Sequence, residues 1–323
     1  MCIYSIVIPV YNRPEEVDEL LESLTQQTFT DFEVIIVEDG SKIPCKDVVD
    51  KYDGQLKIRY FNIENSGPGP ARNYGVQQSS GIFVIILDSD CILPPSYLKS
   101  VDHSFKHYNA DAFGGADRAH KDFSATQKAV NYAMTSFFTT GGIRGSKKKL
   151  DKFYPRSFNM GLKKTVYEAL EGFSRMRYGE DIDFSIRIFK GGYSCHYFPD
   201  AWVYHKRRTD FRQFFRQVNH SGKARIDLFI KYPESLKPVH CLPALFTVGL
   251  AIILVASVFY PPILILPVIY MVALFVDSLM KNKSLKVALL SVPASFVQLT
   301  GYGTGFISAV FSKLVFGKKK SSR

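Results

Sequence analysis

The sequence predicts an α/β protein in which a mostly parallel sheet carries helices on both faces and is followed by C-terminal interfacial and transmembrane helices. Three observations support this fold class. Short, unbroken apolar runs alternate with helical patterns through the first half of the chain. Polar residues follow the ends of several of these runs. The last third holds three long apolar segments, two of them close to the length of a membrane span.

The elements of the first half can be assigned in order. The run SIVIPV at 5–10 is the first expected strand. A helix is expected at 14–27 because Pro14 and two acidic residues begin it and apolar side chains recur at helical spacing. Further strands are expected at 33–39, 57–62 and 83–88, with a helix at 70–79.

The C-terminal part divides by composition. We expect the α/β domain to cover 1–208, amphipathic interfacial helices 209–238, a membrane region 239–316 and a basic tail 317–323. A solvated helix face is the alternative for 209–232. The apolar segments are 241–260, 263–280 and 287–316. Twenty helical residues span roughly 30 Å, the thickness of the hydrocarbon core. Three spans would put the basic tail outside, whereas two spans with a re-entrant or interfacial third segment would keep it inside.

Composition excludes several classes of protein. The chain of 323 residues has 14% aromatic residues, which excludes a disordered protein. Its five cysteines are far apart and form no C-x-x-C pair, so a disulfide scaffold or a cysteine zinc site is not expected, and a reducing compartment fits. No signal peptide precedes the first strand, which predicts a cytoplasmic N-terminal domain.

The net charge of +11 is unevenly distributed. Residues 1–205 are nearly balanced, whereas 206–323 hold 17 of the 41 Lys and Arg and only 4 of the 30 Asp and Glu. A nucleic-acid binder would place basic residues on its folded domain. Because basic residues here flank apolar runs, the pattern favours a protein at a membrane surface and no nucleic-acid partner.

Polar residues gather where the expected strands end. Tyr11 and Asn12 follow the first strand, and Glu38 and Asp39 end the second. The fourth strand is followed by the sequence DSD at 88–90. Ligands of open parallel sheets bind beyond the carboxyl ends of the strands. Each polar residue could be a simple turn residue, but three such ends on one edge predict a site.

The sequence DSD predicts a metal site. Asp88 and Asp90 are two apart, so in an extended segment their carboxylates lie on the same side. Hard oxygen ligands in this arrangement suit Mg²⁺ or Mn²⁺, and such an ion binds a diphosphate. His205, which follows the apolar stretch AWVY, is a candidate third ligand, with a structural histidine as the alternative.

Two further motifs carry charge. GPGPARNYG at 67–75 is not a dinucleotide fingerprint, because Arg72 stands at the third glycine position. Arg72 is therefore interpreted as a cation that approaches a nucleotide, or else as a helix-surface arginine. The pair Glu180-Asp181 begins a helix. It can act as a general base toward a hydroxyl, or simply favour the helix dipole.

Taken together, these motifs resemble the inverting glycosyltransferases of family 2, which have the GT-A fold. The resemblance covers about 200 residues, from SIVIPVYNRPEE through GPGPARNYG, DSD and FNMGLKK to GEDIDFSIR and AWVYH. It implies a nucleotide-sugar donor and a divalent cation, Mg²⁺ or Mn²⁺. The C-terminal pattern is similar to that of membrane-anchored bacterial members that build polysaccharides or exopolysaccharides.

The resemblance also implies roles for individual residues. Asp181 would be the catalytic base, and Asp90, Asp88 and His205 would hold the metal. The acceptor side would include Asn159 and Glu180. The nucleotide sugar would be bordered by Pro9, Tyr11, Glu38, Asp39, Arg72, Asp88 and Ser89. Glu38 departs from the family, in which many members have Asp.

The expected reaction is non-processive. Processive synthases of the family carry Q-x-x-R-W after the base, whereas here Trp202 is the only tryptophan and the later segment reads RQFFRQ. The acceptor would be a lipid-linked oligosaccharide or glycan at the cytoplasmic face of the inner membrane, which a multi-pass C-terminal region would anchor. Polyprenyl phosphate is the alternative acceptor, and a catalytically silent nucleotide-sugar-binding scaffold the alternative function. Acceptor specificity is expected in 112–160, which includes the basic run 147–149.

Overall fold

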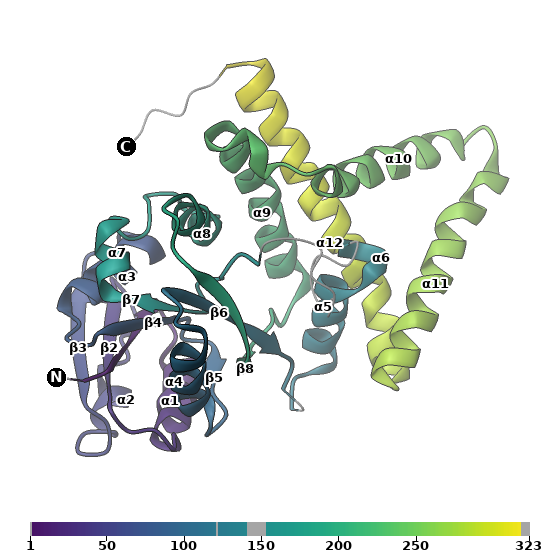
Figure 1. Cartoon of the computed structure of the whole chain (residues 1–323). Helices are drawn as coiled ribbons and strands as arrows, with labels where there is room; N and C mark the ends of the chain where they lie inside the picture. The colour runs from purple at the N-terminus through teal and green to yellow at the C-terminus, as the bar shows by residue number, and fades with distance from the viewer. Residues whose placement is uncertain (1, 121, 141–152, 318–323) are drawn as a thin grey trace. The chain divides into compact units, whose positions relative to one another are not determined.

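The computed structural model describes residues 2–120, 122–140 and 153–317. These residues form two compact units (Figure 1). The first unit comprises 2–120 and 153–206, and the second comprises 122–140 and 207–317. The break after Lys206 lies next to the expected boundary at 208. The segment 122–140, however, belongs to the second unit and not to the α/β domain. The basic runs 147–149 and 318–320 lie outside the described residues.

One sheet organises the first unit. Its described strands are β1 (Tyr4–Val10), β2 (Phe32–Asp39), β3 (Ile58–Ile63), β4 (Phe83–Leu87), β5 (Cys91–Ile92), β6 (Ala112–Arg118), β7 (Asn159–Lys163) and β8 (Cys195–His205). They lie in the order β3-β2-β1-β4-β7-β6-β8-β5. β3, β2, β1 and β4 are parallel neighbours. β7 is antiparallel to β4 and β6, β8 is parallel to β6, and β5 is antiparallel to β8. The four strands expected from the sequence are all present.

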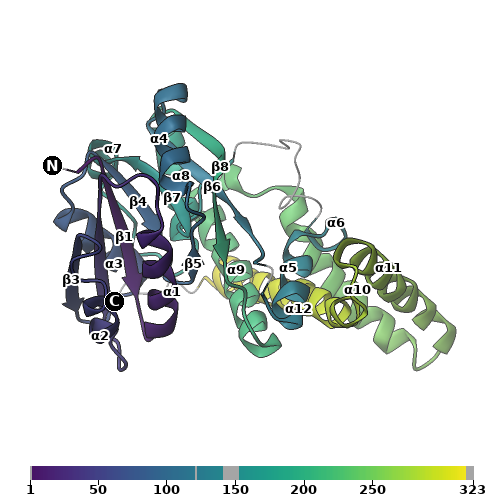
Figure 2. The same ribbon diagram turned by 90° about the horizontal axis from the view of Figure 1, so that it is seen from below.

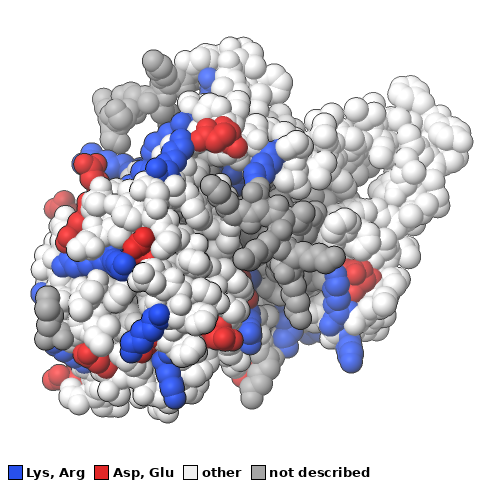
Figure 3. Space-filling view, in the orientation of Figure 1, with Lys and Arg blue, Asp and Glu red and all other residues white. Residues whose placement is uncertain are grey.

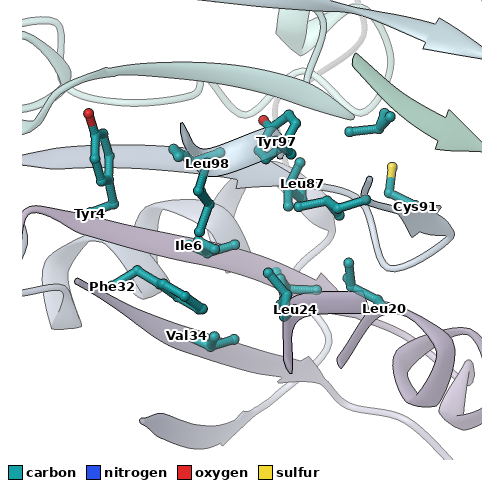
Figure 4. Close-up of a cluster of buried hydrophobic side chains, with 14 of the residues drawn as sticks. Tyr4, Ile6, Leu20, Leu24, Phe32, Val34, Leu87, Cys91, Tyr97 and Leu98 are labelled. Atoms are coloured by element: carbon teal, nitrogen blue, oxygen red, sulfur yellow. The ribbon is translucent and has the colours of Figure 1, made fainter. Parts of the chain in front are cut away.

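Helices cover both faces of this sheet. One face packs against α1 (Pro14–Thr25), α2 (Lys46–Asp50) and α4 (Tyr97–Tyr108). The other face packs against α3 (Pro68–Gln78), α7 (Lys164–Ala169) and α8 (Glu180–Lys190). Figure 4 shows the first of these cores, in which Ile6 of β1 and Leu24 of α1 lie beside Leu98 of α4. Alternate residues of each strand supply the two cores because successive side chains point to opposite faces.

The second unit is helical. It contains α5 (Ala125–Thr135), α6 (Phe137–Thr140), α9 (Phe211–Lys231), α10 (Leu242–Ala256), α11 (Ile265–Asn282) and α12 (Leu285–Ala309), which ends in a π-helical segment (Val310–Val315). Short 3₁₀ helices η1 (Pro233–Ser235), η2 (Pro238–Cys241) and η3 (Pro261–Leu264) connect them. α10 and α11 form a hairpin (Figures 1 and 2), and Figure 1 shows its legs diverging from their connection.

Small residues allow α9 and α12 to pack closely. A Cβ atom on Gly222 of α9 would lie 2.2 Å from the carbonyl oxygen of Tyr302, and one on Gly305 of α12 would lie 2.1 Å from that of Asn219. The apolar side of α9 is therefore covered by α12 rather than left free. The expected amphipathic pattern of 209–232 is present as a single helix, with its apolar side inside this unit.

Two helical stretches among the described residues are long and apolar enough to cross a membrane. They are Pro238–Ala256, with 19 residues, and Pro261–Asn282, with 22 residues. They match the first two apolar segments of the sequence. The third segment forms α12, which is largely buried against α5, α9, α10 and α11.

Candidate active site

The polar residues expected at the strand ends meet at one edge of the sheet in the first unit. Asn12, just after β1, has a left-handed backbone with φ of 54°, a conformation that asparagine tolerates well. Its amide oxygen accepts hydrogen bonds from the backbone N–H groups of Lys42 and Ile43. The loops that follow β1 and β2 are thereby fixed to each other, and they border the site.

Asp88, Asp90 and His205 form the centre of the site. One potential ligand atom from each residue lies within 4.8 Å of the others. β5 brings His205 to this position because Cys91, next to Asp90, pairs with His205 in the sheet. The imidazole stacks on the ring of Phe158, with 4.6 Å between ring centroids. The two aspartates of the DSD sequence and the histidine that strand pairing brings to them thus form one group of three suitable ligands.

The Asp90 carboxylate is held between two basic groups. Its Oδ2 lies 2.7 Å from Nη1 of Arg13, and its Oδ1 lies 3.1 Å from Nε2 of His205. Burial alone would raise the pKa of Asp90, but the neighbouring His205 and Arg13 outweigh burial and lower it. Oδ1 is buried and has the His205 imidazole as its neighbour. Two carboxylates and an imidazole whose ligand atoms lie within 4.8 Å of one another are a donor set that a divalent cation accepts, so the residues present fit a metal ion.

Arg72 connects this centre to helix α8. Its guanidinium donates to Asp88 Oδ1 at 2.7 Å and to Glu180 Oε1 at 2.9 Å. It also donates to the Ser157 hydroxyl at 3.1 Å and lies over the ring of Phe173. Burial would lower the pKa of Arg72, but the two carboxylates outweigh burial and raise it. Arg72 is thus a buried cation and not a helix-surface arginine.

Glu180 and Asp181 begin helix α8 at the same edge. Burial raises the pKa of Glu180, and the adjacent charge of Asp181 adds to this effect, while Arg72 opposes it. Asp181 Oδ2 lies 2.8 Å from Nε of Arg156, and its Oδ1 accepts from the N–H of Ile182 at 2.8 Å. The Asp181 side chain is 12% exposed. A carboxylate of this kind can accept a proton once a substrate displaces Arg156.

The two acidic residues at the end of β2 have different surroundings. Asp39 accepts from the N–H groups of Ser66 and Gly67, at 2.7 and 2.9 Å, and so orders the loop before α3. Glu38 is fully buried and accepts from the Ser41 hydroxyl and the Cys45 N–H. The Glu38 carboxylate is thus enclosed by the protein and stabilises the loop after β2, and its expected place beside a nucleotide stays a prediction.

Three other expected nucleotide contacts differ in access. Tyr11 is 49% exposed, so its ring is available to a ligand. Pro9 is half-buried within β1, and Ser89 is buried in the turn between Asp88 and Asp90.

Asn159, expected on the acceptor side, lies inside the first unit. It is fully buried at the start of β7. Its Oδ1 accepts from the Tyr97 hydroxyl at 2.7 Å, and its Nδ2 donates to the carbonyl oxygens of Ala116 and Ala201 at 3.1 and 2.9 Å. Gly115 makes room for it, since a Cβ there would come within 2.3 Å of Nδ2. These contacts give Asn159 a structural role, and its expected acceptor-side role stays a prediction.

We expect Asn159→Ala to lower the free energy of unfolding by about 3 kcal/mol, because three buried groups would each lose a hydrogen bond worth about 1 kcal/mol. Thermal unfolding of the purified protein measures this change. Asn62→Ala, at an exposed position in β3, is the matched control and should leave the transition unchanged. If the two variants unfold alike, Asn159 does not have the structural role described above.

Sequence reasoning missed Arg13, Arg156 and Ser157. Arg13 contacts a residue 77 positions away, and Ser157 contacts one 85 positions away. Contacts between residues so far apart in sequence cannot be predicted from local spacing. The one available signal for Arg13 was its place in YNRPEE, directly after a strand end.

Comparison with known proteins places this site in a family. A family model described as glycosyl transferase family 2 matches residues 5–170. Glycosyltransferase AglE of Haloferax volcanii is 26% identical over 254 residues, which cover 76% of this chain and 80% of AglE. Poly(ribitol-phosphate) beta-N-acetylglucosaminyltransferase TarS of Staphylococcus aureus is 34% identical over 115 residues, 34% of this chain and 20% of TarS. Several of the curated relatives are thus much longer than the segment they share with this chain.

Solved structures show the same fold. Mannosyltransferase PcManGT from Pyrobaculum calidifontis, in complex with GDP-Man and Mn²⁺, matches with a TM-score of 0.65 and 15% identity, over 96% of this chain and 88% of that chain. TarS 1-349 in complex with UDP-GlcNAc matches with a TM-score of 0.52 and 19% identity, over 95% and 91% of the two chains. These similarities confirm the GT-A fold, and with the family match over half of its length the chain belongs to glycosyltransferase family 2.

Proposed function

We propose that the protein transfers a sugar from a nucleotide-sugar donor to a hydroxyl of a lipid-linked oligosaccharide or glycan, with inversion and without processive polymerisation. The observation that carries this proposal is the continuous polar path from Asp90 through Asp88, Arg72 and Glu180 to the start of α8. This path supports a cation site and a candidate base at one sheet edge. The structural neighbours in complex with GDP-Man and UDP-GlcNAc support a nucleotide-sugar donor.

In this mechanism the acceptor oxygen attacks the anomeric carbon of the donor as the bond to the diphosphate breaks. The proton of the acceptor hydroxyl passes to the Asp181 carboxylate, and the nucleoside diphosphate leaves with the bonding electrons. Arg72 and Arg13 lie close enough to Asp88 and Asp90 to balance the negative charge that develops. A divalent cation held by Asp88, Asp90 and His205 would supply further neutralisation. A single displacement inverts the anomeric carbon.

One observation favours a second acceptor, a polyprenyl phosphate. Asp181 is already engaged by Arg156 at 2.8 Å, and a phosphate oxygen needs no base to remove a proton. Arg156 would then receive the phosphate, because arginine binds this anion well. The intact acidic cluster, in contrast, gives no support to a catalytically silent scaffold.

Nucleotide release tests the proposed reaction. Purified protein is incubated with Mn²⁺, a panel of UDP- and GDP-sugars, and membranes extracted from the source cells. Release of the nucleoside diphosphate that depends on the added membranes supports transfer to a lipid-linked acceptor. Nucleotide-sugar binding without any release in the presence of those membranes would contradict an enzymatic role and favour the scaffold.

We further propose that the second unit anchors the protein at the cytoplasmic face of the inner membrane, with the first unit in the cytoplasm. The support is the apolar surface of α10 and α11. Leu245, Ile252 and Val255 are 66%, 62% and 66% exposed. Such a surface is unfavourable in water and suits hydrocarbon.

We expect the combined variant Leu245→Arg, Ile252→Arg and Val255→Arg to lose membrane association. Each arginine near the centre of a bilayer costs about 2.5–3.5 kcal/mol, while the exposed positions tolerate the change in water. Membrane flotation of cell extracts measures the bound fraction. Ile43→Arg, at a position 60% exposed in the first unit, is the control and should remain bound. Equal flotation of both variants would contradict anchoring by the hairpin.

A further inference from the structure

The hairpin formed by α10 and α11 is apolar from one end to the other, including its connection. No charged residue occurs between Leu242 and Val276. Figure 3 shows the corresponding surface without Lys, Arg, Asp or Glu, apart from the region where α11 ends. At the connection, Val258 and Phe259 are 77% and 85% exposed. If this turn reached the water beyond the membrane, exposure of such large apolar side chains would be unfavourable.

The backbone N–H groups of this connection are satisfied by hydrogen bonds within the protein. The N–H groups of Ser257, Val258, Phe259 and Tyr260 all donate to carbonyl oxygens within α10, at 2.8–3.2 Å. The next two residues, Pro261 and Pro262, have no N–H, and that of Ile263 donates to Tyr260. Non-helical backbone is unstable in hydrocarbon because its polar groups find no water. This turn satisfies every N–H between 257 and 263, so its donors need no water.

By residue count each helical stretch is long enough to cross a membrane, but the uncharged part of α11 is shorter than the whole stretch. The first charged residue after the turn is Asp277 of α11. Its Oδ2 accepts from the Tyr132 hydroxyl at 2.7 Å and from Lys281 at 2.9 Å. The helical rise from Asp277 to the turn is about 25 Å, against about 30 Å for the hydrocarbon core. Because the two legs diverge (Figure 1), the depth they reach is smaller still. Tyr260, 64% exposed, can extend its hydroxyl toward the opposite headgroups.

An apolar cleft of about 200 Å³ lies between the legs. It is lined by Phe246, Gly249 and Ile253 of α10, Leu266 and Tyr270 of α11, and Phe296 of α12. A cleft with this lining is unfavourable in water. A hydrocarbon chain fills it without leaving a polar group unpaired.

We propose that α10 and α11 form a re-entrant hairpin, which enters the membrane from the cytoplasmic face and ends within the hydrocarbon of the far leaflet. The occupant of its apolar surface is the bilayer itself. This proposal rests on the membrane association proposed above. In it neither α10 nor α11 crosses the bilayer completely, whereas two transmembrane helices would each cross it. The proposal also removes the conflict between three spans and the basic tail, since both ends of the hairpin and all that follows stay on one side.

The packing of α12 agrees with this topology. α12 lies against α9, with Gly301 of α12 close to Val218 of α9 and Gly305 close to Asn219. α9 carries Arg212, Arg216, Lys223 and Arg225 along its length, which excludes it from hydrocarbon. The part of α12 that packs on α9, around Gly301 and Gly305, therefore stays at the same face, outside the hydrocarbon core.

Site-specific thiol labelling tests the proposal in the full chain. Phe259→Cys reports the tip, Glu234→Cys the approach to α10, and Lys286→Cys the exit from α11. Sealed membrane vesicles of both orientations are treated with a membrane-impermeant maleimide, and the labelled residue is identified by peptide mass. Only variants that retain nucleotide-sugar binding are compared, which keeps unfolded protein out of the result.

We expect Glu234→Cys and Lys286→Cys to be labelled from the same side, and Phe259→Cys from neither side until detergent is added. Labelling of Phe259→Cys from the opposite side would establish a spanning hairpin and overturn the proposal. So would labelling of the two ends from opposite sides. If alkaline carbonate releases the protein, the membrane association itself fails. In that case an unlabelled Phe259→Cys would indicate a second copy of the chain on this surface.

Discussion

Asp90→Asn should reduce sugar transfer at least about 100-fold at saturating donor. The substitution keeps the size of the side chain but removes the charge that would hold a divalent cation. Charge stabilisation by a bound metal contributes several kcal/mol to a reaction of this type, and each 1.36 kcal/mol is tenfold in rate. This expectation depends on the Asp90 carboxylate, whose ligand atom lies within 4.8 Å of those of Asp88 and His205.

The measurement is transfer rate over a titration with Mn²⁺, beside calorimetry of donor binding with and without the metal. In the wild type Mn²⁺ should tighten donor binding, and in Asp90→Asn this enhancement should disappear. Asp50→Asn, whose side chain is 56% exposed in a surface pair with Lys46, is the matched control. Equal metal enhancement in Asp90→Asn and the wild type would remove Asp90 from the metal site.

Thermal unfolding must accompany this comparison. Asp90 pairs with Arg13, whose side chain is 28% exposed. When the Asp90 charge is lost, the Arg13 guanidinium is therefore still partly solvated by water. The stability change should therefore be modest. A variant that loses transfer while its unfolding temperature stays near that of the wild type locates the defect in the site.

The fold could be predicted from the sequence because its determinants are local. The runs at 5–10, 33–39 and 83–88 are unbroken and apolar, so they form strands covered on both faces. That the segment 122–140 belongs to the second unit could not be predicted, because its determinants are not local. The Tyr132 hydroxyl of α5 bonds to Asp277, 145 residues away, and no local pattern reveals this pairing.

Site residues that are close in sequence could be predicted to lie together. The surroundings of residues whose partners are distant in sequence could not be predicted. Asp88 and Asp90 lie together as predicted, although they do so in a turn closed by the Cys91 N–H and the Asp88 carbonyl oxygen, at 3.2 Å, and not in the extended segment that was expected. Glu38 and Asp39 are adjacent in a strand, so their side chains point to opposite faces. The Glu38 carboxylate bonds to Cys45, whereas that of Asp39 bonds to Ser66. The sequence could not say which of the two borders the site. The same holds for Asn159, because its partners come from three distant segments.

Asp181→Asn is expected to have the largest effect on the chemical step if the acceptor is a hydroxyl. General base catalysis contributes about 10²–10⁴-fold, so transfer should fall by at least that range. Donor affinity should change only a few-fold, because the proposed nucleotide and metal contacts lie on Asp39, Arg72 and Asp88. The Asp181 contact with Arg156 survives in part, since an asparagine oxygen still accepts a hydrogen bond.

The alternative is that Asp181 only stabilises the start of α8. Asparagine serves nearly as well as aspartate at a helix N-terminus, so transfer would then be almost unchanged. Asp210→Asn provides the matched control, because Asp210 caps α9 by accepting from the N–H of Gln213 at 2.8 Å. Single-turnover transfer and donor binding, measured for both variants, separate chemistry from affinity.

The same variant distinguishes the two proposed acceptors. A hydroxyl must lose its proton as it attacks, so its reaction depends on the Asp181 carboxylate. A polyprenyl phosphate is already an anion, and its reaction should be slowed little by Asp181→Asn but strongly by Arg156→Gln, which removes the cation that would bind it. Loss of transfer in Asp181→Asn with activity retained in Arg156→Gln would identify a hydroxyl acceptor. The reverse pattern would remove Asp181 from the mechanism and identify a phosphate.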